Sequence, residues 1–164
     1  MNKLRLIIIC LAATVASGIL FVNIYTSVVD APNWGHDMPT SIQAARNYFI
    51  VANPGTFFRM FAPVNQVVTL VALVSCWTVD RRLRYFLLAA LLIAVGTDVM
   101  TFGYFYPRNA IMFVNPMEGN LDAIRTAWTG WTSMNWLRSV IAAIGVTLDF
   151  AALVRFAGLK ARQV

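Results

Sequence analysis

Four long stretches of apolar residues dominate the pattern of this chain, at positions 6–29, 58–79, 85–106 and 136–156. The first stretch carries no charged residue, the second a single arginine near its start, the third one aspartate, and the fourth three charged side chains. A helix needs roughly 20 apolar residues to cross a bilayer core of about 30 Å. Backbone groups in lipid must be hydrogen-bonded within their own segment. The pattern therefore predicts an all-α protein, a single domain over residues 1–164 in which four transmembrane helices form an up-down-up-down bundle.

Helical spacing continues into the two long segments that connect these spans. Thr40 followed by Gln43 has the form of a capping box, and apolar residues then recur at helical spacing until Asn53. In the second segment a stripe advances in steps of four and three residues. It consists of Ile124, Trp128, Trp131, Asn135 and Arg138. We expect short helices in both connecting segments, and a fourth long helix that begins near Asn120 and projects beyond the bilayer.

Composition narrows the class of protein further. Hydrophobic residues make up 59% of the chain and charged residues 12%, with a mean hydropathy of +0.67. Soluble domains carry about 25% charged residues, so the composition excludes a soluble enzyme and a disordered chain. The net charge of +6 does not indicate nucleic-acid binding, because the basic residues are dispersed among the apolar spans and form no single stripe.

The basic residues do indicate an orientation. With four crossings, eight of the 13 Lys and Arg residues fall on one face, namely Lys3, Arg5, Arg81, Arg82, Arg84, Arg155, Lys160 and Arg162. Basic residues accumulate on the cytoplasmic side of membrane spans. We therefore expect an integral protein of a bacterial inner (plasma) membrane, with both termini cytoplasmic and both long connecting segments outside.

The first apolar stretch has an alternative interpretation as a cleaved signal peptide, because a basic segment precedes it. Its apolar residues continue through Val22, past any plausible cleavage site near Ala16 or Ser17, whereas a signal h-region spans only about 7–15 residues. We expect an uncleaved first helix.

The inventory of reactive side chains is small. His36 is the single histidine, so a paired-histidine haem or copper site and a Glu-x-x-His di-iron site have no ligands. Cys10 and Cys76 fall in the cytoplasmic halves of their helices, where a disulfide is not expected. There is no glycine-rich phosphate loop. We expect neither a metal nor a cofactor.

Polar residues inside the spans are the candidates for function, because they are costly in lipid. Asp98 interrupts the third span, Arg59 and Gln66 share a face of the second, and Asn135 and Arg138 begin the fourth. One interpretation is a polar pocket open to the outer face, with Asp98 as acid or base and Arg59 or Arg138 as its partner. The other is a buried ion pair that only fixes helix register.

Two further polar positions have ordinary explanations. Asp149 is expected to reach toward the cytoplasmic arginines or to pair with one of them. The tryptophans Trp128 and Trp131 fit an interfacial aromatic belt as well as a stacking surface for a ligand.

Motifs flanking the third and fourth spans resemble those of the anthrone oxygenase-like family of small four-helix membrane proteins. They are Tyr106-Pro107-Arg108-Asn109, and Trp128, Trp131, Asn135 and Arg138. The resemblance extends over nearly the whole chain and implies a four-span bundle. For the polyketide members of that family it also implies oxidation of an anthrone to an anthraquinone by oxygen without an evident cofactor. Asp98 and His36 have no counterpart in the family pattern.

Such a reaction needs a base, donors for the substrate oxyanion and a dry aromatic slot. The chain offers Asp98 or His36 as the base, and Arg138 with Asn109 or Asn135 as donors. The walls of the slot are expected to be Trp128, Trp131 and Tyr104, with Arg59 and Gln66 as further substrate-binding residues.

Three classes of function remain open at this stage. They are a cofactor-independent oxygenase of aromatic substrates, an accessory subunit packed against other membrane-protein subunits, and a protein that binds a lipid or a quinone-like molecule. An enzyme should keep an open outer pocket, whereas an accessory subunit should expose a broad apolar face and satisfy its buried polar groups internally. In every case membrane lipid is a partner, and a small apolar aromatic ligand is the expected occupant of a pocket.

Overall fold

The computed structural model describes residues 2–161, which are almost entirely helical and contain no β-strand. Four long helices account for most of the chain: α1 (Asn2–Tyr25), α4 (Pro54–Cys76), α5 (Arg81–Met100) and α7 (Leu121–Ala161). Shorter elements are η1 (Thr26–Asp30), α2 (Ala31–Gly35), α3 (Thr40–Tyr48), η2 (Thr101–Phe105) and α6 (Tyr106–Phe113). The predicted all-helical fold is confirmed.

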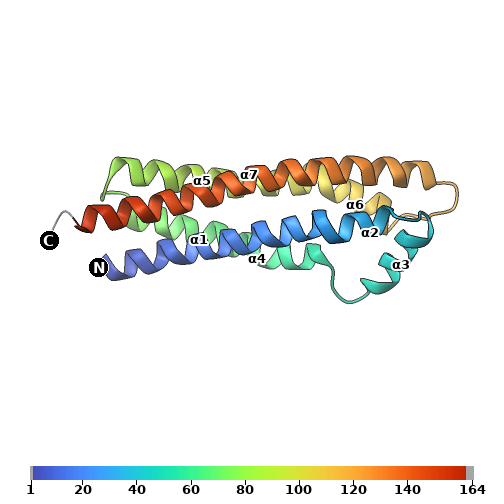
Figure 1. The fold of residues 1–164 in the computed structure, drawn as a ribbon, viewed down its shortest axis with the longest axis horizontal. Helices are drawn as coiled ribbons and strands as arrows, with labels where there is room; N and C mark the ends of the chain where they lie inside the picture. Colours follow the sequence, from blue (N-terminus) through green and yellow to red (C-terminus); the bar gives the residue numbers. More distant parts are fainter. Residues whose placement is uncertain (1, 162–164) are drawn as a thin grey trace.

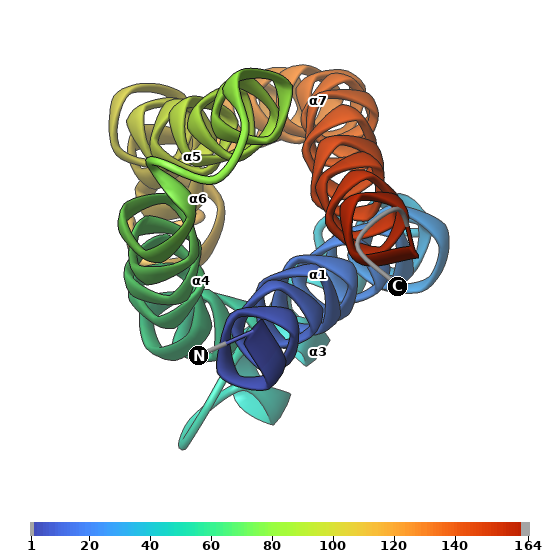
Figure 2. The same cartoon turned by 90° about the vertical axis from the view of Figure 1, so that its left-hand side faces the viewer.

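The four long helices form an elongated bundle in which α1, α4, α5 and α7 follow one another around a common axis (Figures 1 and 2). The beginning of α1, the end of α7 and the connection from α4 to α5 lie at one end, which we call the turn end (Figure 1). The short helices α2, α3 and α6 lie at the opposite end, which we call the loop end. The two ends therefore differ in architecture.

Each long helix belongs to a helical stretch that is long and apolar enough to cross a membrane. These stretches are Lys3–Gly35, Pro54–Cys76, Arg81–Phe113 and Leu121–Leu159. Many large apolar side chains on their outward faces are exposed, including Phe21 (68%), Val74 (65%) and Val154 (70%). Such surfaces are unfavourable in water and suit lipid, so the four stretches indicate a membrane protein. Each predicted span overlaps one of these stretches, although α4 ends at Cys76, short of the expected residue 79.

Two π-helical segments join the long helices to the short ones without a break. η1 continues α1 into α2, and η2 continues α5 into α6. A π-helical turn rotates the following residues relative to an α-helix, and such turns occur frequently at functional sites. Both segments end up beside the large cavity described below.

The predicted connecting helices are confirmed, but their ends differ in detail. α3 begins at Thr40 after Pro39 with no side-chain cap, so the predicted capping box of Thr40 and Gln43 is absent. The capping box belongs instead to α4, where Asn53 and Thr56 bond to each other's backbone N–H groups. The predicted stop at Asn53 is therefore the start of the next helix. α7 runs unbroken from Leu121, which confirms the predicted start of the fourth long helix near Asn120.

Two hydrophobic clusters hold the bundle together, one near each end. The turn-end cluster contains Ile9, Ala72, Leu73, Cys76, Leu83, Leu87, Ala152 and Phe156. The loop-end cluster contains Ala31, Trp34, Ile42, Phe105, Met112, Ile124, Ala127 and Trp131. Buried polar residues lie outside both clusters, and they include Asn23, Asn65, Asn135, Arg138 and Ser139 of α1, α4 and α7.

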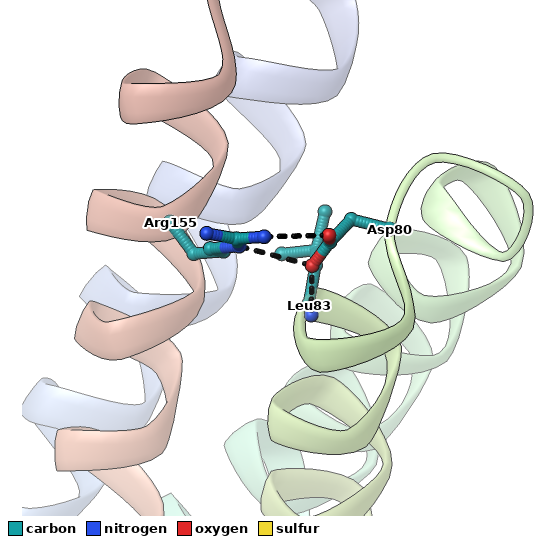
Figure 3. A network of polar contacts seen from close by, with 3 residues as sticks. All are labelled: Asp80, Leu83 and Arg155. Atoms are coloured by element: carbon teal, nitrogen blue, oxygen red, sulfur yellow. Dashed lines mark hydrogen bonds and ion pairs between the residues drawn. The ribbon is translucent and has the colours of Figure 1, made fainter.

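The α4–α5 connection is fixed to α7 by a pair of charge-assisted hydrogen bonds. Asp80 caps α5 by accepting from the Leu83 backbone N–H at 3.0 Å, and it accepts from Arg155 Nη2 at 2.7 Å and Nε at 3.0 Å (Figure 3). These donors hold the pKa of the Asp80 carboxyl well below its usual range.

The expectation that Asp149 reaches the cytoplasmic arginines is wrong. Asp149 is 2% exposed and its Oδ1 has no hydrogen-bond partner, and among the described residues Arg155 pairs with Asp80 instead.

Candidate functional site

A cavity of about 460 Å³ opens at the loop end, between the start of α4, the η2–α6 segment, α7 and the α2–α3 region. We call it the large cavity. Much of its wall is aromatic, and the residues concerned are Trp34, Phe49, Phe58, Phe105, Tyr106, Phe113 and Trp131. Several of these rings contact one another edge to face, for example Trp34 on Trp131 with centroids 5.1 Å apart. The cavity is thus large and apolar enough for a small aromatic molecule.

Arg138 lies at the buried end of the large cavity. It is 7% exposed, and its Cζ lies 4.0 Å from the centroid of the Phe105 ring and 5.2 Å from that of Phe58. Its Nη1 donates to Thr101 Oγ1 at 3.2 Å and its Nη2 to Asn135 Oδ1 at 2.6 Å. A guanidinium has five N–H donors, so three remain without a protein acceptor, among them that on Nε. Arg138 forms no ion pair with any residue in 2–161.

Asn135 positions Arg138 through a network that connects α7 to α1 and η1. Asn135 is fully buried, accepts from Arg138 through Oδ1, and donates through Nδ2 to Ser27 Oγ at 2.6 Å. Longer bonds from the same Nδ2 reach the Asn23 carbonyl and Thr26 Oγ1 at 3.3 Å. Asn23 in turn donates through Nδ2 to the Asn135 carbonyl at 3.2 Å. The guanidinium is therefore held by a neutral amide whose own orientation is fixed.

A second, smaller cavity of about 40 Å³ lies beside Arg138. It shares Phe58, Thr101 and Arg138 with the large cavity, and Asp98 lines it as the one acidic residue of either cavity. The predicted ion pair between Asp98 and Arg59 or Arg138 is wrong. Asp98 Oδ2 accepts a hydrogen bond from Gln66 Nε2 at 2.7 Å, and within the described residues Asp98 forms no ion pair.

The remaining predicted site residues divide into two groups. Arg59, Asn109 and Trp131 line the large cavity, so the structure brings them together with Arg138. Arg59 is exposed and donates to Thr56 Oγ1 at 3.2 Å, while the Trp131 indole N–H is buried without a partner.

Five predicted residues line neither cavity: Gln66 and Asn135, which bind Asp98 and Arg138 as described above, and Trp128, Tyr104 and His36. Trp128 donates from Nε1 to the Ala31 carbonyl at 2.8 Å, so its ring fastens α2 to α7. The Tyr104 hydroxyl donates to the Gly130 carbonyl at 3.1 Å, and Arg108 Cζ lies 3.4 Å from the centroid of the Tyr104 ring. His36 is exposed just beyond α2 and is not among the residues that line the cavity with Arg138.

Several lining residues were missed from the sequence, although some had a signal. Thr101 and Phe105 follow Asp98 at i+3 and i+7, which is the spacing of one helical face. Phe58 and Asn65 lie one position before Arg59 and Gln66, and they define the face of α4 that lines the small cavity. Arg46 on α3 gave no signal, because a loop arginine is usually solvated.

No family model, no curated protein and no solved structure matches this chain.

Proposed function

We propose that this membrane protein oxidises a planar aromatic substrate of the anthrone or quinol type with molecular oxygen, in the large cavity and without a cofactor. The observation that carries the proposal is Arg138, a buried cation with three unused donors beside an aromatic-walled cavity. A buried cation that forms no ion pair within residues 2–161 is unfavourable. It is suited to a ligand on which negative charge develops during reaction.

The chemistry follows from the substrate. An anthrone carries an acidic CH₂ group, and loss of one proton gives an electron-rich enolate that reacts with oxygen. Overall one anthrone and one O₂ give one anthraquinone and one water: the methylene carbon becomes a carbonyl, and its two hydrogens leave with the second oxygen atom. In this proposal Arg138 stabilises the enolate oxygen, with Asn109 as a further donor, and Asp98 accepts the proton directly or through a water in the small cavity.

The resemblance to anthrone oxygenase-like proteins supports this reaction class, and so does the open cavity. Buried polar atoms without partners, among them Asn23 Oδ1, Asn65 Oδ1 and Trp131 Nε1, are not the internally satisfied set expected of an accessory subunit. An accessory role in a larger membrane complex is therefore the less favoured alternative.

The test is oxygen consumption by purified protein in lipid nanodiscs with 1,8-dihydroxyanthrone, measured above the spontaneous rate. Loss of one preorganised oxyanion donor typically lowers kcat by about 10²–10³. We expect a loss of that order for Arg138→Gln, a marked loss for Asp98→Asn, and none for Arg125→Gln, whose exposed side chain pairs with Asp122 away from the cavity. No excess rate in the wild type, or an excess rate that survives Arg138→Gln combined with Asp98→Asn, would refute the oxidation.

One observation favours a second candidate, binding of a quinone-like molecule without turnover. Asp98 lines the small cavity and not the large one, so the only acid nearby is set back from the aromatic walls. Saturable binding of 1,8-dihydroxyanthraquinone without oxygen consumption would assign this function.

We also propose that the chain crosses the membrane up-down-up-down with the turn end in the cytoplasm. The support is that Lys3, Arg5, Arg81, Arg82, Arg84 and Arg155 lie near the turn end; the side chain of Lys160 and all of Arg162 fall outside the described residues. A membrane-impermeant thiol reagent should label Ser41→Cys and Asn120→Cys in whole cells and leave Arg82→Cys unlabelled. The reverse pattern would overturn the orientation.

A further inference from the structure

Among residues 2–161, three arginines line the large cavity, and no aspartate or glutamate does. Arg138 lies at the buried end, and Arg46 and Arg59 line other parts of the wall. Like charges around one space repel each other, and the repulsion is stronger where water is displaced. A neutral aromatic substrate needs one positive group, for its developing oxyanion, and leaves the other two unexplained.

Arg46 is held in place by a neutral acceptor. Its Nε and Nη2 both donate to the Met112 carbonyl, at 2.9 and 2.7 Å, which ties α3 to α6 across the cavity. Three N–H donors are left for a ligand, two on Nη1 and one on Nη2. Since the partner is a carbonyl, the charge of Arg46 is not neutralised.

Arg59 marks the open side of the cavity. It is exposed, as is the neighbouring lining residue Asn53, and Val114 on the cavity wall is 77% exposed. Its one hydrogen bond is to the Thr56 hydroxyl, another neutral group. Exposure of the lining residues thus rises from Arg138 and Phe105, which are 7% and 1% exposed, toward the mouth.

Acidic residues are available at the loop end but are placed elsewhere. Asp122 pairs with Arg125 at 3.8 Å, and Asp37 and Glu118 are outside the lining of the cavity. The cavity is therefore positively charged because the acidic residues at this end do not line it, and not because this end lacks acidic residues.

We infer that the substrate carries, besides the oxygen held by Arg138, a permanently ionised carboxylate that Arg46 and Arg59 bind near the mouth. The inference rests on the proposed function only in taking the large cavity as the substrate site. Arginine suits this role because its planar fork matches the two oxygens of a carboxylate. The ligand then spans the cavity with its aromatic body against the rings and an oxygen-bearing group at each end.

The experiment compares two probes that differ by one group, 1,8-dihydroxyanthraquinone and its 3-carboxylic acid, titrated into the protein in zwitterionic lipid nanodiscs. We expect the acid to bind about tenfold more tightly, which corresponds to roughly 1.4 kcal/mol. Arg59→Gln should reduce this preference, and Arg46→Gln combined with Arg59→Gln should abolish it while the neutral probe still binds. Arg125→Gln is the matched control and should leave the preference unchanged. Arg138→Gln should weaken both probes to a similar extent.

The outcomes separate this inference from the proposed function. Equal binding of the two probes by the wild type, or a preference that persists in the double variant, overturns the carboxylate site. If phosphatidylglycerol added to the nanodiscs displaces the acid, the arginines bind a lipid headgroup and the assignment to an aromatic acid is wrong. Because binding is measured without turnover, a retained preference with no oxygen consumption refutes the oxidation and leaves the carboxylate site standing.

Discussion

Replacing Asn135 is the most informative perturbation of the site, because this amide both supports Arg138 and joins α7 to α1. In Asn135→Ala, Arg138 loses its 2.6 Å acceptor and keeps only Thr101 Oγ1. The bond from Asn135 to Ser27 Oγ is lost as well, together with the weaker bonds of the same amide.

The cost of these losses follows from the two kinds of bond. A hydrogen bond to a charged group contributes about 1.5–3 kcal/mol. Interhelical hydrogen bonds between neutral groups in membrane proteins average about 0.6 kcal/mol, with a maximum near 1.7. We therefore expect Asn135→Ala to lower the free energy of unfolding by about 2–5 kcal/mol. Asn23→Ala is the matched control: Asn23 is the same residue type and 2% exposed, but it makes no bond to Arg138. Its expected loss is about 1–2 kcal/mol.

Reversible unfolding in mixed detergent micelles measures both values. Equal losses in Asn135→Ala and Asn23→Ala would show that the bond to Arg138 contributes nothing, and would remove the argument that this guanidinium is held in place for a ligand. Asn135→Asp tests the role of the positive charge, because a carboxylate at this position neutralises Arg138. That variant should remain folded and yet bind 1,8-dihydroxyanthraquinone far more weakly, and unchanged binding would contradict the role given to Arg138.

Two further substitutions test the packing on either side of the site. In Gly35→Ala the new Cβ overlaps the Trp128 ring, which cannot tilt away without losing its hydrogen bond to α2. We expect this variant to lower the free energy of unfolding by about 1–3 kcal/mol in the same assay. Gly103→Ala is the control and should change it little, because there is open space around Gly103. Asp80→Asn keeps an N-cap but loses the charge that faces Arg155. Because the pKa of Asp80 is lowered in the folded protein, the wild type should be more stable than this variant above about pH 4. The difference in free energy of unfolding should shrink as pH falls below that value. A difference that does not vary between pH 3 and 7 would contradict the ion pair.

The features that depend on position along one helix were accessible from the sequence. Length and hydropathy located the four long helices, and the four-and-three spacing of Ile124, Trp131, Asn135 and Arg138 placed these residues on one buried face of α7. Trp128 belongs to the same stripe but lies at its margin, half-buried, where it fastens α2 and lines neither cavity.

The features that depend on how helices meet were not accessible. The sequence offered Arg59 and Arg138 as partners for Asp98, but the rotation of α4 about its axis puts Gln66 within hydrogen-bond distance of the carboxylate and leaves Arg59 exposed. Periodicity fixes which residues share a face within about one position, and one position is a rotation of about 100°. The same uncertainty of one position explains why Tyr104 was predicted as a wall of the site, whereas Phe105 lines the cavity.

Two arginines in this chain differ in how their guanidinium groups are bound. At the turn end, Arg155 forms two charge-assisted hydrogen bonds with the Asp80 carboxylate, and both side chains are partly exposed. At the loop end, an acid is close by, since Asp98 and Arg138 line the same small cavity, yet the acid is bound by Gln66 and the arginine by Asn135. This arrangement leaves three of the five donors of Arg138 without a protein acceptor, and the proposed binding of a developing oxyanion beside the aromatic walls rests on those donors.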